Sequence, residues 1–186
     1  MPYTPEHRAQ TRAKIVTAAR QMFNLHGFDG VSIDQIMAHA GLSRGGFYHH
    51  FVSKEALFAE AVVSFLDTAR PAELTGPALI RAAMTGYLSE AHLNEVADQC
   101  PMIAVPSDVA RGGKDVRRSY QRVFQATLNQ FETNLPGPTE QARQKALMLC
   151  ILSIGGMILA RTMEDAALSD EIRQAAAGAP DALGLD

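Results

Sequence analysis

The stretch SIDQIMAHAGLSRGGFYHHF, residues 32–51, decides the fold predicted for this chain. Ser32 precedes a short segment of periodic apolar residues and Gln35 follows it by three positions, a pairing typical of a capping box at a helix start. Gly41 ends that segment, and Ser43 stands where it can cap another short helix that reaches the paired histidines. Two short helices joined by a tight, glycine-containing turn form a helix-turn-helix arrangement.

The sequence on either side also predicts helices. Apolar residues recur at steps of three and four from Thr11 to Leu25, and Gly27 supplies a stop. Ser53 can cap a further helix that begins KEALFAEAVVSFL. Later helices are expected at residues 78–96, 115–134, 139–163 and 169–177, with a frayed tail after them. The predicted fold class is all-α, with an N-terminal three-helix helix-turn-helix domain and a larger helical domain after it.

Composition places the chain among soluble globular proteins. Its 186 residues are 47% hydrophobic and 20% charged. The longest uncharged run, residues 146–160, is shorter than the roughly 18 residues that a membrane span needs, so it indicates a buried helix and no membrane partner. The first residues lack the apolar region of a secretory signal, which predicts a cytoplasmic protein. Cys100 and Cys150 have no CxxC spacing, so neither a disulfide framework nor a metal site is expected.

Charge is distributed unevenly along the chain. Residues 1–55 hold six Lys or Arg against four Asp or Glu, together with five of the six histidines, although the whole chain has a formal net charge of −3. This bias favours an anionic partner for the N-terminal part.

The segment RAKIVTAARQMFNLHGFDGVSIDQIMAHAGLSRGGFYHHFVSKEALF, residues 12–58, resembles the DNA-binding domain of the tetracycline-repressor (TetR/AcrR) family of bacterial transcriptional regulators. The resemblance implies a helix-turn-helix DNA-binding domain at residues 1–55 and a helical regulatory and dimerisation domain at residues 56–186. It also implies a ligand-responsive repressor that binds a near-palindromic DNA operator as a homodimer and releases it when a small-molecule effector binds. No cofactor is expected.

Arg44 falls in the first turn of the second helix of the motif, whose N-terminal residues meet base edges in the major groove. An arginine there can donate two hydrogen bonds to guanine, worth about 1–3 kcal/mol of base discrimination, whereas the alternative is a solvated arginine at a helix end. Gly45 and Gly46 each cost roughly 0.8–1 kcal/mol in a helix, which close approach of DNA would offset. The resemblance supports Gly45, while Gly46 departs from the hydroxyl residue commoner in the family.

Tyr48 and His49 follow at spacings that favour contacts to phosphate, although Tyr48 could instead close the core. Phe47 and Phe51 are assigned to the core, and His50 is left open between the two roles. Ser32 and Lys54 lie at expected helix starts, where amide groups and the helix dipole attract phosphate. For Ser32 the alternative is a helix cap without a phosphate contact. The predicted DNA-binding residues are Ser32, Ser43, Arg44, Gly45, Gly46, Tyr48, His49 and Lys54.

The helix expected at residues 142–163 is apolar nearly all round, and Gly155-Gly156 permits close approach of a second helix. A buried helix within one subunit is the alternative. The predicted dimer interface consists of Leu147, Ile151, Ile154 and Ile158.

The sequence leaves three alternatives to the repressor. Cys100 precedes Pro101 at an expected helix start, which could make the thiol reactive and the protein an electrophile or oxidant sensor, although buried inert cysteines are commoner. A constitutive or architectural DNA-binding protein would lack an effector. An enzyme is not expected, because no GxSxG, P-loop, HExxH or dinucleotide-binding glycine motif occurs.

Overall fold

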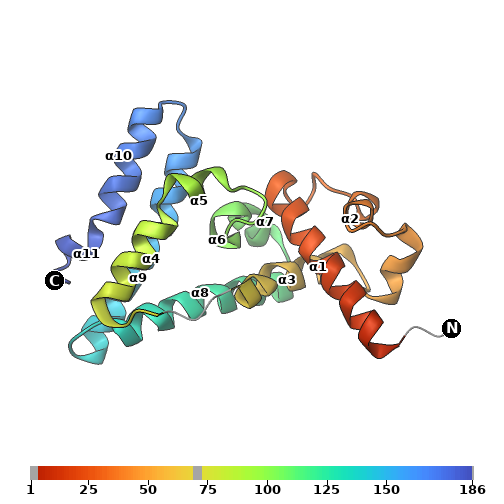
Figure 1. Ribbon diagram of the computed structural model, residues 1–186, viewed down its shortest axis with the longest axis horizontal. Coiled ribbons are helices and arrows are strands. Elements are labelled where there is room, and N and C mark those ends of the chain that lie inside the picture. The colour runs from red at the N-terminus through yellow and green to blue at the C-terminus, as the bar shows by residue number, and fades with distance from the viewer. Residues whose placement is uncertain (1–3, 69–72, 186) are drawn as a thin grey trace. The chain divides into compact units, whose positions relative to one another are not determined.

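The computed structural model describes residues 4–68 and 73–185, and within these ranges all regular structure is helical (Figure 1). The chain divides into two compact units, the first formed by residues 1–69 with 96–123 and the second by residues 70–95 with 124–186. The predicted all-α class is confirmed. The functional boundary after residue 55 stays a prediction, because compactness alone places residues 56–69 and 96–123 with the N-terminal helices.

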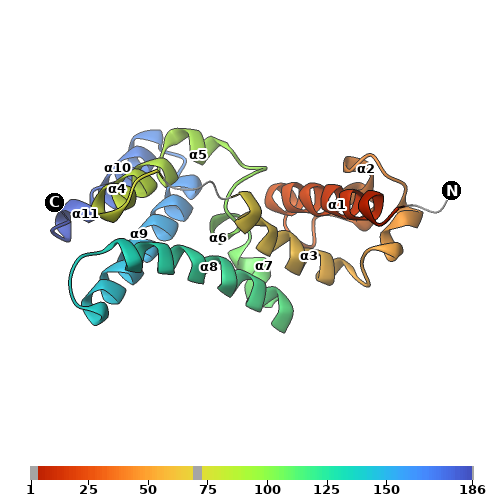
Figure 2. The ribbon, with the colours of Figure 1, turned by 60° about the horizontal axis from the view of Figure 1, so that its bottom comes forward.

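The first unit contains the helix-turn-helix. Its elements, visible in Figures 1 and 2, are α1 (Pro5–His26), α2 (Ile33–His39), the 3-10 helix η1 (Arg44–His49), α3 (Lys54–Val63), the 3-10 helix η2 (Ser64–Thr68), α6 (Pro101–Ala104), α7 (Pro106–Arg111) and the first half of α8 (Lys114–Asn134). Phe23, Phe28 and Phe58 bring α1, the following loop and α3 together, with ring centroids of Phe23 and Phe58 4.8 Å apart. Such aromatic contacts add to the stabilisation from apolar burial.

The first helix begins earlier than predicted. It starts at Pro5 instead of Thr11, because the hydroxyl of Thr4 accepts a hydrogen bond from the His7 amide at 3.2 Å and proline suits the first helical position. The predicted stop at Gly27 is confirmed: its φ of 73° lies in the left-handed region that glycine adopts at low cost.

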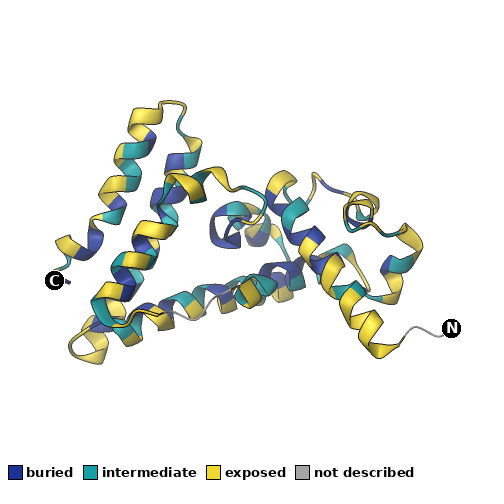
Figure 3. Cartoon of the chain, in the orientation of Figure 1, coloured by how far each residue is buried: buried dark blue, intermediate teal, exposed yellow. Residues whose placement is uncertain are grey.

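The second unit consists of α4 (Gly76–Tyr87), α5 (Glu90–Asn94), the second half of α8, α9 (Thr139–Thr162), α10 (Ala166–Ala177) and α11 (Ala179–Ala182). In Figure 3, buried positions alternate with exposed ones along α4, α9 and α10. On α9 the buried set is Ala142, Ala146, Leu149, Cys150, Ser153, Gly156, Met157 and Ala160. By length and composition alone α9 could cross a membrane, a test that the core helix of a soluble protein also passes.

Two predictions for this unit are wrong. The single helix expected at residues 78–96 is two helices, because the Ser89 hydroxyl accepts a hydrogen bond from the His92 amide at 3.1 Å and starts α5 afresh. The tail expected to fray is packed: Pro180 and Leu185 are buried, and the guanidinium of Arg81 donates to the Asp181 carboxylate and to the Leu185 carbonyl. The sequence did not predict α11, because glycine and proline interrupt its apolar residues and leave no helical periodicity.

Candidate nucleic-acid interface

The start of α2 is fixed by the predicted capping box. The Ser32 hydroxyl accepts a hydrogen bond from the Gln35 amide at 3.2 Å, and the Gln35 side-chain oxygen accepts one from the Ser32 amide at 2.8 Å. Ile36 and Met37 are buried beneath it. The Ser32 hydroxyl therefore caps α2. Ser32 is also exposed, and its contact with phosphate stays a prediction.

The second helix of the motif differs from the prediction. Residues Arg44–His49 form a 3-10 helix, and the Ser43 side chain makes no capping hydrogen bond, so the predicted cap is wrong. Instead the Ser43 carbonyl accepts from the Gly46 amide at 3.1 Å. Paired glycines disfavour the α-helix, and the tighter 3-10 turn still carries Phe47 into the core, where it is fully buried.

Arg44 lies exposed at the first position of η1 and is held by an acidic residue of α2. Its Nη1 lies 2.9 Å from Oδ2 of Asp34, and both side chains are largely exposed. Sequence reasoning missed Asp34, since residues ten apart meet only after the turn folds. An exposed ion pair is worth about 0–1 kcal/mol, so the pair can orient Arg44 and still yield it to a base.

The paired glycines are not required by crowding within the protein. A Cβ at Gly45 would meet no atom of the described chain within 4 Å, and one at Gly46 would meet only the Met37 methyl at 3.7 Å. Neither glycine has a left-handed φ. Close approach of a nucleic acid therefore stays the predicted reason for Gly45 and Gly46.

Tyr48 and His49 lie on the exposed side of η1. Tyr48 is 64% exposed, so it is not the core residue of the alternative interpretation, and its ring meets that of buried Phe47 edge-on at 5.1 Å. The assignment of Phe51 to the core is confirmed, as only 3% of it is exposed. Val52, which sequence reasoning missed, is 88% exposed just after the end of η1. An exposed apolar side chain there suits contact with a thymine methyl group.

Lys54 follows the Ser53 cap, whose hydroxyl accepts from the Ala56 amide at 3.0 Å. The Lys54 ammonium donates to the Phe28 carbonyl and lies 4.3 Å from the centroid of the Phe28 ring. Burial lowers the pKa of Lys54, while the negative charges of Asp29 and Asp108 oppose this shift. This lysine therefore joins α3 to the loop after α1. For the predicted phosphate contact, the Lys54 ammonium would have to donate to the phosphate as well as to the Phe28 carbonyl.

Two arginines that sequence reasoning missed tie α1 to the recognition element. Arg8 donates from Nη2 to the His49 carbonyl at 2.9 Å, and Arg12 donates to the His50 carbonyl and to the Glu60 carboxylate. The Arg12 guanidinium also lies 4.1 Å from the centroid of the Phe51 ring. Their spacing of four residues on one helix face was the only signal in the sequence.

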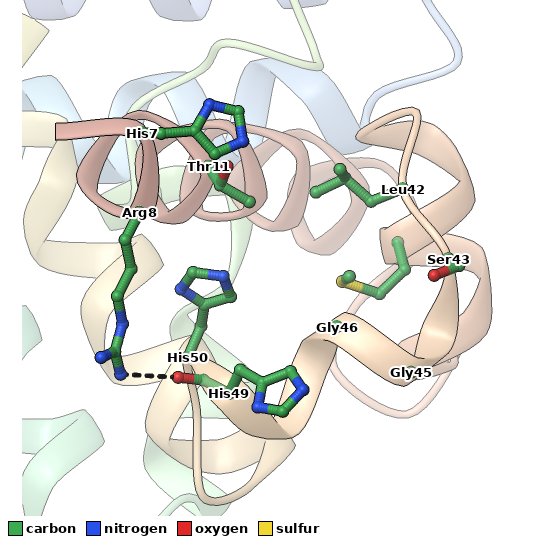
Figure 4. Close-up of a pocket in the computed structure, with 10 residues that line it drawn as sticks. His7, Arg8, Thr11, Leu42, Ser43, Gly45, Gly46, His49 and His50 are labelled. Atoms are coloured by element: carbon green, nitrogen blue, oxygen red, sulfur yellow. Dashed lines mark hydrogen bonds between the residues drawn. The ribbon is translucent and has the colours of Figure 1, made fainter. Parts of the chain in front are cut away.

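A cavity of about 560 Å³ lies between the start of α1 and η1 (Figure 4). His50 projects into it, and the Nδ1 atom is buried without a hydrogen-bond partner in the described chain. Burial, reinforced by the positive charges of Arg8, Arg12 and His49, lowers the pKa of His50. The open question about His50 is thus answered by geometry: it belongs to this cavity and not to the packed core.

The described residues contain no group of three or more His, Cys, Asp or Glu placed to hold a metal ion. Cys100 and Cys150 are both buried and form no disulfide with each other. Burial raises the pKa of Cys150 to about 11, which keeps that thiol protonated at neutral pH.

Comparison with known proteins identifies the N-terminal segment. Residues 15–61 match the family model of bacterial regulatory proteins, tetR family. The HTH-type transcriptional regulator YfiR of Bacillus subtilis is 29% identical over 124 residues, which make up 63% of this chain and 59% of that protein. The HTH-type transcriptional repressor AcnR of Corynebacterium glutamicum is 34% identical over 80 residues, 43% of this chain and 42% of that protein. The chain thus spans less than two thirds of these relatives.

Solved structures share the fold over nearly the whole chain. A TetR-family transcriptional regulator from Agrobacterium tumefaciens superimposes with a TM-score of 0.74 and 20% identity over 91% of this chain and 97% of that one. The reduced form of NemR from E. coli gives a TM-score of 0.73 and 18% identity over 91% of this chain and 94% of that one. At such identities the likeness extends to the fold alone.

Proposed function

Because the chain belongs to the tetR family of bacterial regulatory proteins, we propose that it is a cytoplasmic transcriptional regulator that binds a near-palindromic DNA operator as a homodimer. A small-molecule effector then releases the operator. The names of its relatives, which are transcriptional regulators and repressors, support a regulator and not an enzyme.

One observation carries the DNA-binding proposal: the first residues of the second motif helix are exposed and polar where a recognition helix would meet base edges. Arg44, Tyr48 and His49 lie outside the core, while Phe47 of the same short helix is fully buried and fixes the rotation of η1. The helix can therefore present Arg44 to a base without unfolding.

Binding to DNA selected from genomic fragments tests this proposal. We expect Arg44→Ala to cost about 1–3 kcal/mol for the selected operator and to relax the base preference at one position of each half-site. Tyr48→Phe removes a single hydroxyl that faces phosphate, so it should weaken selected and random duplexes alike. A footprint of Arg44→Ala with unchanged base preference would remove this residue from base reading.

The homodimer is supported by an uncovered apolar face on α9. Met148, Ile151, Leu152 and Leu159 are exposed, and successive helical turns place them on one side of the helix. Of the four residues predicted for the interface, Ile151 lies on this face, and the other three are half-buried at its edge. A second copy of the chain would remove this surface from water, and two-fold pairing would supply two recognition helices for two half-sites.

The effector separates the proposed regulator from its constitutive alternative. A ligand that releases DNA must bind the two states of the dimer with different affinity, and a hundredfold loss of operator affinity requires about 2.7 kcal/mol of coupling. A thermal-shift screen of small apolar and electrophilic compounds, followed by operator titration, tests for this coupling. Binders that never alter DNA affinity at saturation would favour a constitutive DNA-binding protein.

The thiol-sensor alternative meets a steric obstacle. Cys100 is only 4% exposed at the start of α6, so a reagent would reach its sulfur only after local opening. Electrophiles that release DNA from the wild type but not from Cys100→Ser would establish this alternative.

A further inference from the structure

The cavity between α1 and η1 has a cationic side. His7 and Arg8 approach it from α1, and His49 and His50 from η1 and its end (Figure 4). None of the ten residues that line it is acidic, and the carboxylate of Glu60 forms an ion pair with Arg12. The guanidinium of Arg8 carries a fixed positive charge, and this charge favours a bound anion on this side of the cavity.

The opposite wall is apolar and open. Met37 and Leu42 line it together with the two glycines of η1, whose missing side chains leave the space unfilled. A volume of about 560 Å³ falls within the range of small-molecule sites and far exceeds the roughly 30 Å³ of a water molecule. A bare inorganic ion would leave this wall uncovered.

From these two walls we propose that the cavity binds a small organic anion. Its acidic group faces Arg8 and His50, and its apolar body lies against Met37 and Leu42. Arg8 donates one N–H to the His49 carbonyl, which leaves further donors of the guanidinium for the ligand. His50 lines the same side of the cavity.

Occupancy has a consequence for DNA that rests on the proposed function. Gly45, Gly46 and His49 line the cavity and also belong to the predicted DNA-binding set. An anion held among them adds negative charge next to the predicted DNA-binding residues and repels phosphate. The ligand therefore weakens binding to every duplex, in contrast to an effector that acts through the second unit.

Benzenesulfonate is a suitable probe, because its charge does not change with pH and its ring matches the apolar wall. Calorimetry and histidine side-chain NMR on the full chain should show saturable binding, with a rise in the pKa of His50 because the anion stabilises the imidazolium facing Arg8, Arg12, His7 and His49. Benzyl alcohol, the neutral control, should bind at least about tenfold more weakly, as expected when a charged hydrogen bond is lost.

Matched variants separate the two walls. Arg8→Gln should weaken benzenesulfonate at least about tenfold while Arg8→Lys retains most of the binding, because the charge is kept. Gly46→Leu should abolish binding by filling the cavity, since its Cβ points at the Met37 methyl from an ordinary distance. Circular dichroism and urea unfolding check that each variant folds.

Binding of the probe that survives both Arg8→Gln and Gly46→Leu would overturn the proposal, as would the absence of any saturable binding. If Arg8→Gln weakens duplex DNA but benzenesulfonate does not bind, the cavity holds a backbone phosphate and the small-anion proposal is wrong. Saturable binding in a protein that shows no affinity for any duplex would support the cavity and refute the proposed function separately.

Discussion

Ile151→Glu offers the sharpest test of the homodimer, because this side chain is 63% exposed on α9 and contributes little to the fold of a single copy. Full burial of an isoleucine is worth about 1.5–3 kcal/mol, so covering the exposed part yields about 1–2 kcal/mol per copy. Two-fold symmetry doubles this to about 2–4 kcal/mol, and an unpaired carboxylate in the interface adds its desolvation cost. The dimer dissociation constant should rise at least about thirtyfold.

Light scattering after size-exclusion chromatography, over a dilution series of wild type and variant, measures this change. Leu25→Glu is the matched control: Leu25 is 45% exposed on α1, outside the predicted interface, so the variant should dimerise as the wild type does. Ile154→Glu is less informative, because Ile154 is half-buried and a charge there also disturbs the subunit. A wild-type monomer at micromolar concentration, or an Ile151→Glu protein with unchanged dimerisation, would refute the reasoning.

Three further predictions follow from contacts within single units. Asp34→Asn should raise affinity for random duplexes, because it removes a negative charge, and should reduce operator preference, because Arg44 loses its partner at 2.9 Å; competition titrations measure both. Asn24→Ala should lower the free energy of unfolding by about 1–3 kcal/mol in urea denaturation, since the Nδ2 of this buried side chain donates to two main-chain carbonyls at 3.0 and 2.8 Å. Burial and Arg161 lower the pKa of His92, so the unfolded state binds the proton more readily than the folded state does. The free energy of unfolding should therefore be highest above pH 6.5 and fall as the pH drops below it. His92→Gln should flatten this part of a pH profile measured by urea unfolding.

Local signals predicted much of the first unit. The capping box at Ser32 and the stop at Gly27 depend on neighbours within four residues, and both are confirmed. The form of η1 was missed because its two glycines weaken the helix while burial of Phe47 holds the turn, and the outcome of that competition depends on packing. Packing also decides the tail, where Leu185 is buried although its surroundings suggest a loop.

The candidate site was predicted less completely than the fold. The exposed positions of Arg44 and Tyr48 agree with the motif, but the cavity behind them was invisible, because it joins Arg8 to His50 across 42 positions of sequence. The engagement of Lys54 with the Phe28 carbonyl has the same origin, a contact between distant segments. Sequence spacing reveals which residues share one helix face, and it does not reveal which faces meet.

Segment 96–113 extends the proposed DNA-binding unit beyond its helix-turn-helix and suggests how an effector could reach it. The carbonyls of residues 97 and 99 accept from Asn24, the Asp108 carboxylate accepts from the Phe28 amide at 3.1 Å, and the Glu55 carboxylate accepts from the Gly113 amide at 2.8 Å. These bonds involve the last turns of α1, the loop after it and the first turn of α3, which flank the helix-turn-helix. A shift of the segment must either break them or carry those flanks with it. The helix α8 begins just after this segment and continues into the second unit, so it connects a ligand bound in the second unit to these bonds. Such a ligand can shift the recognition element only by the difference in its affinity for the states with these bonds intact and broken.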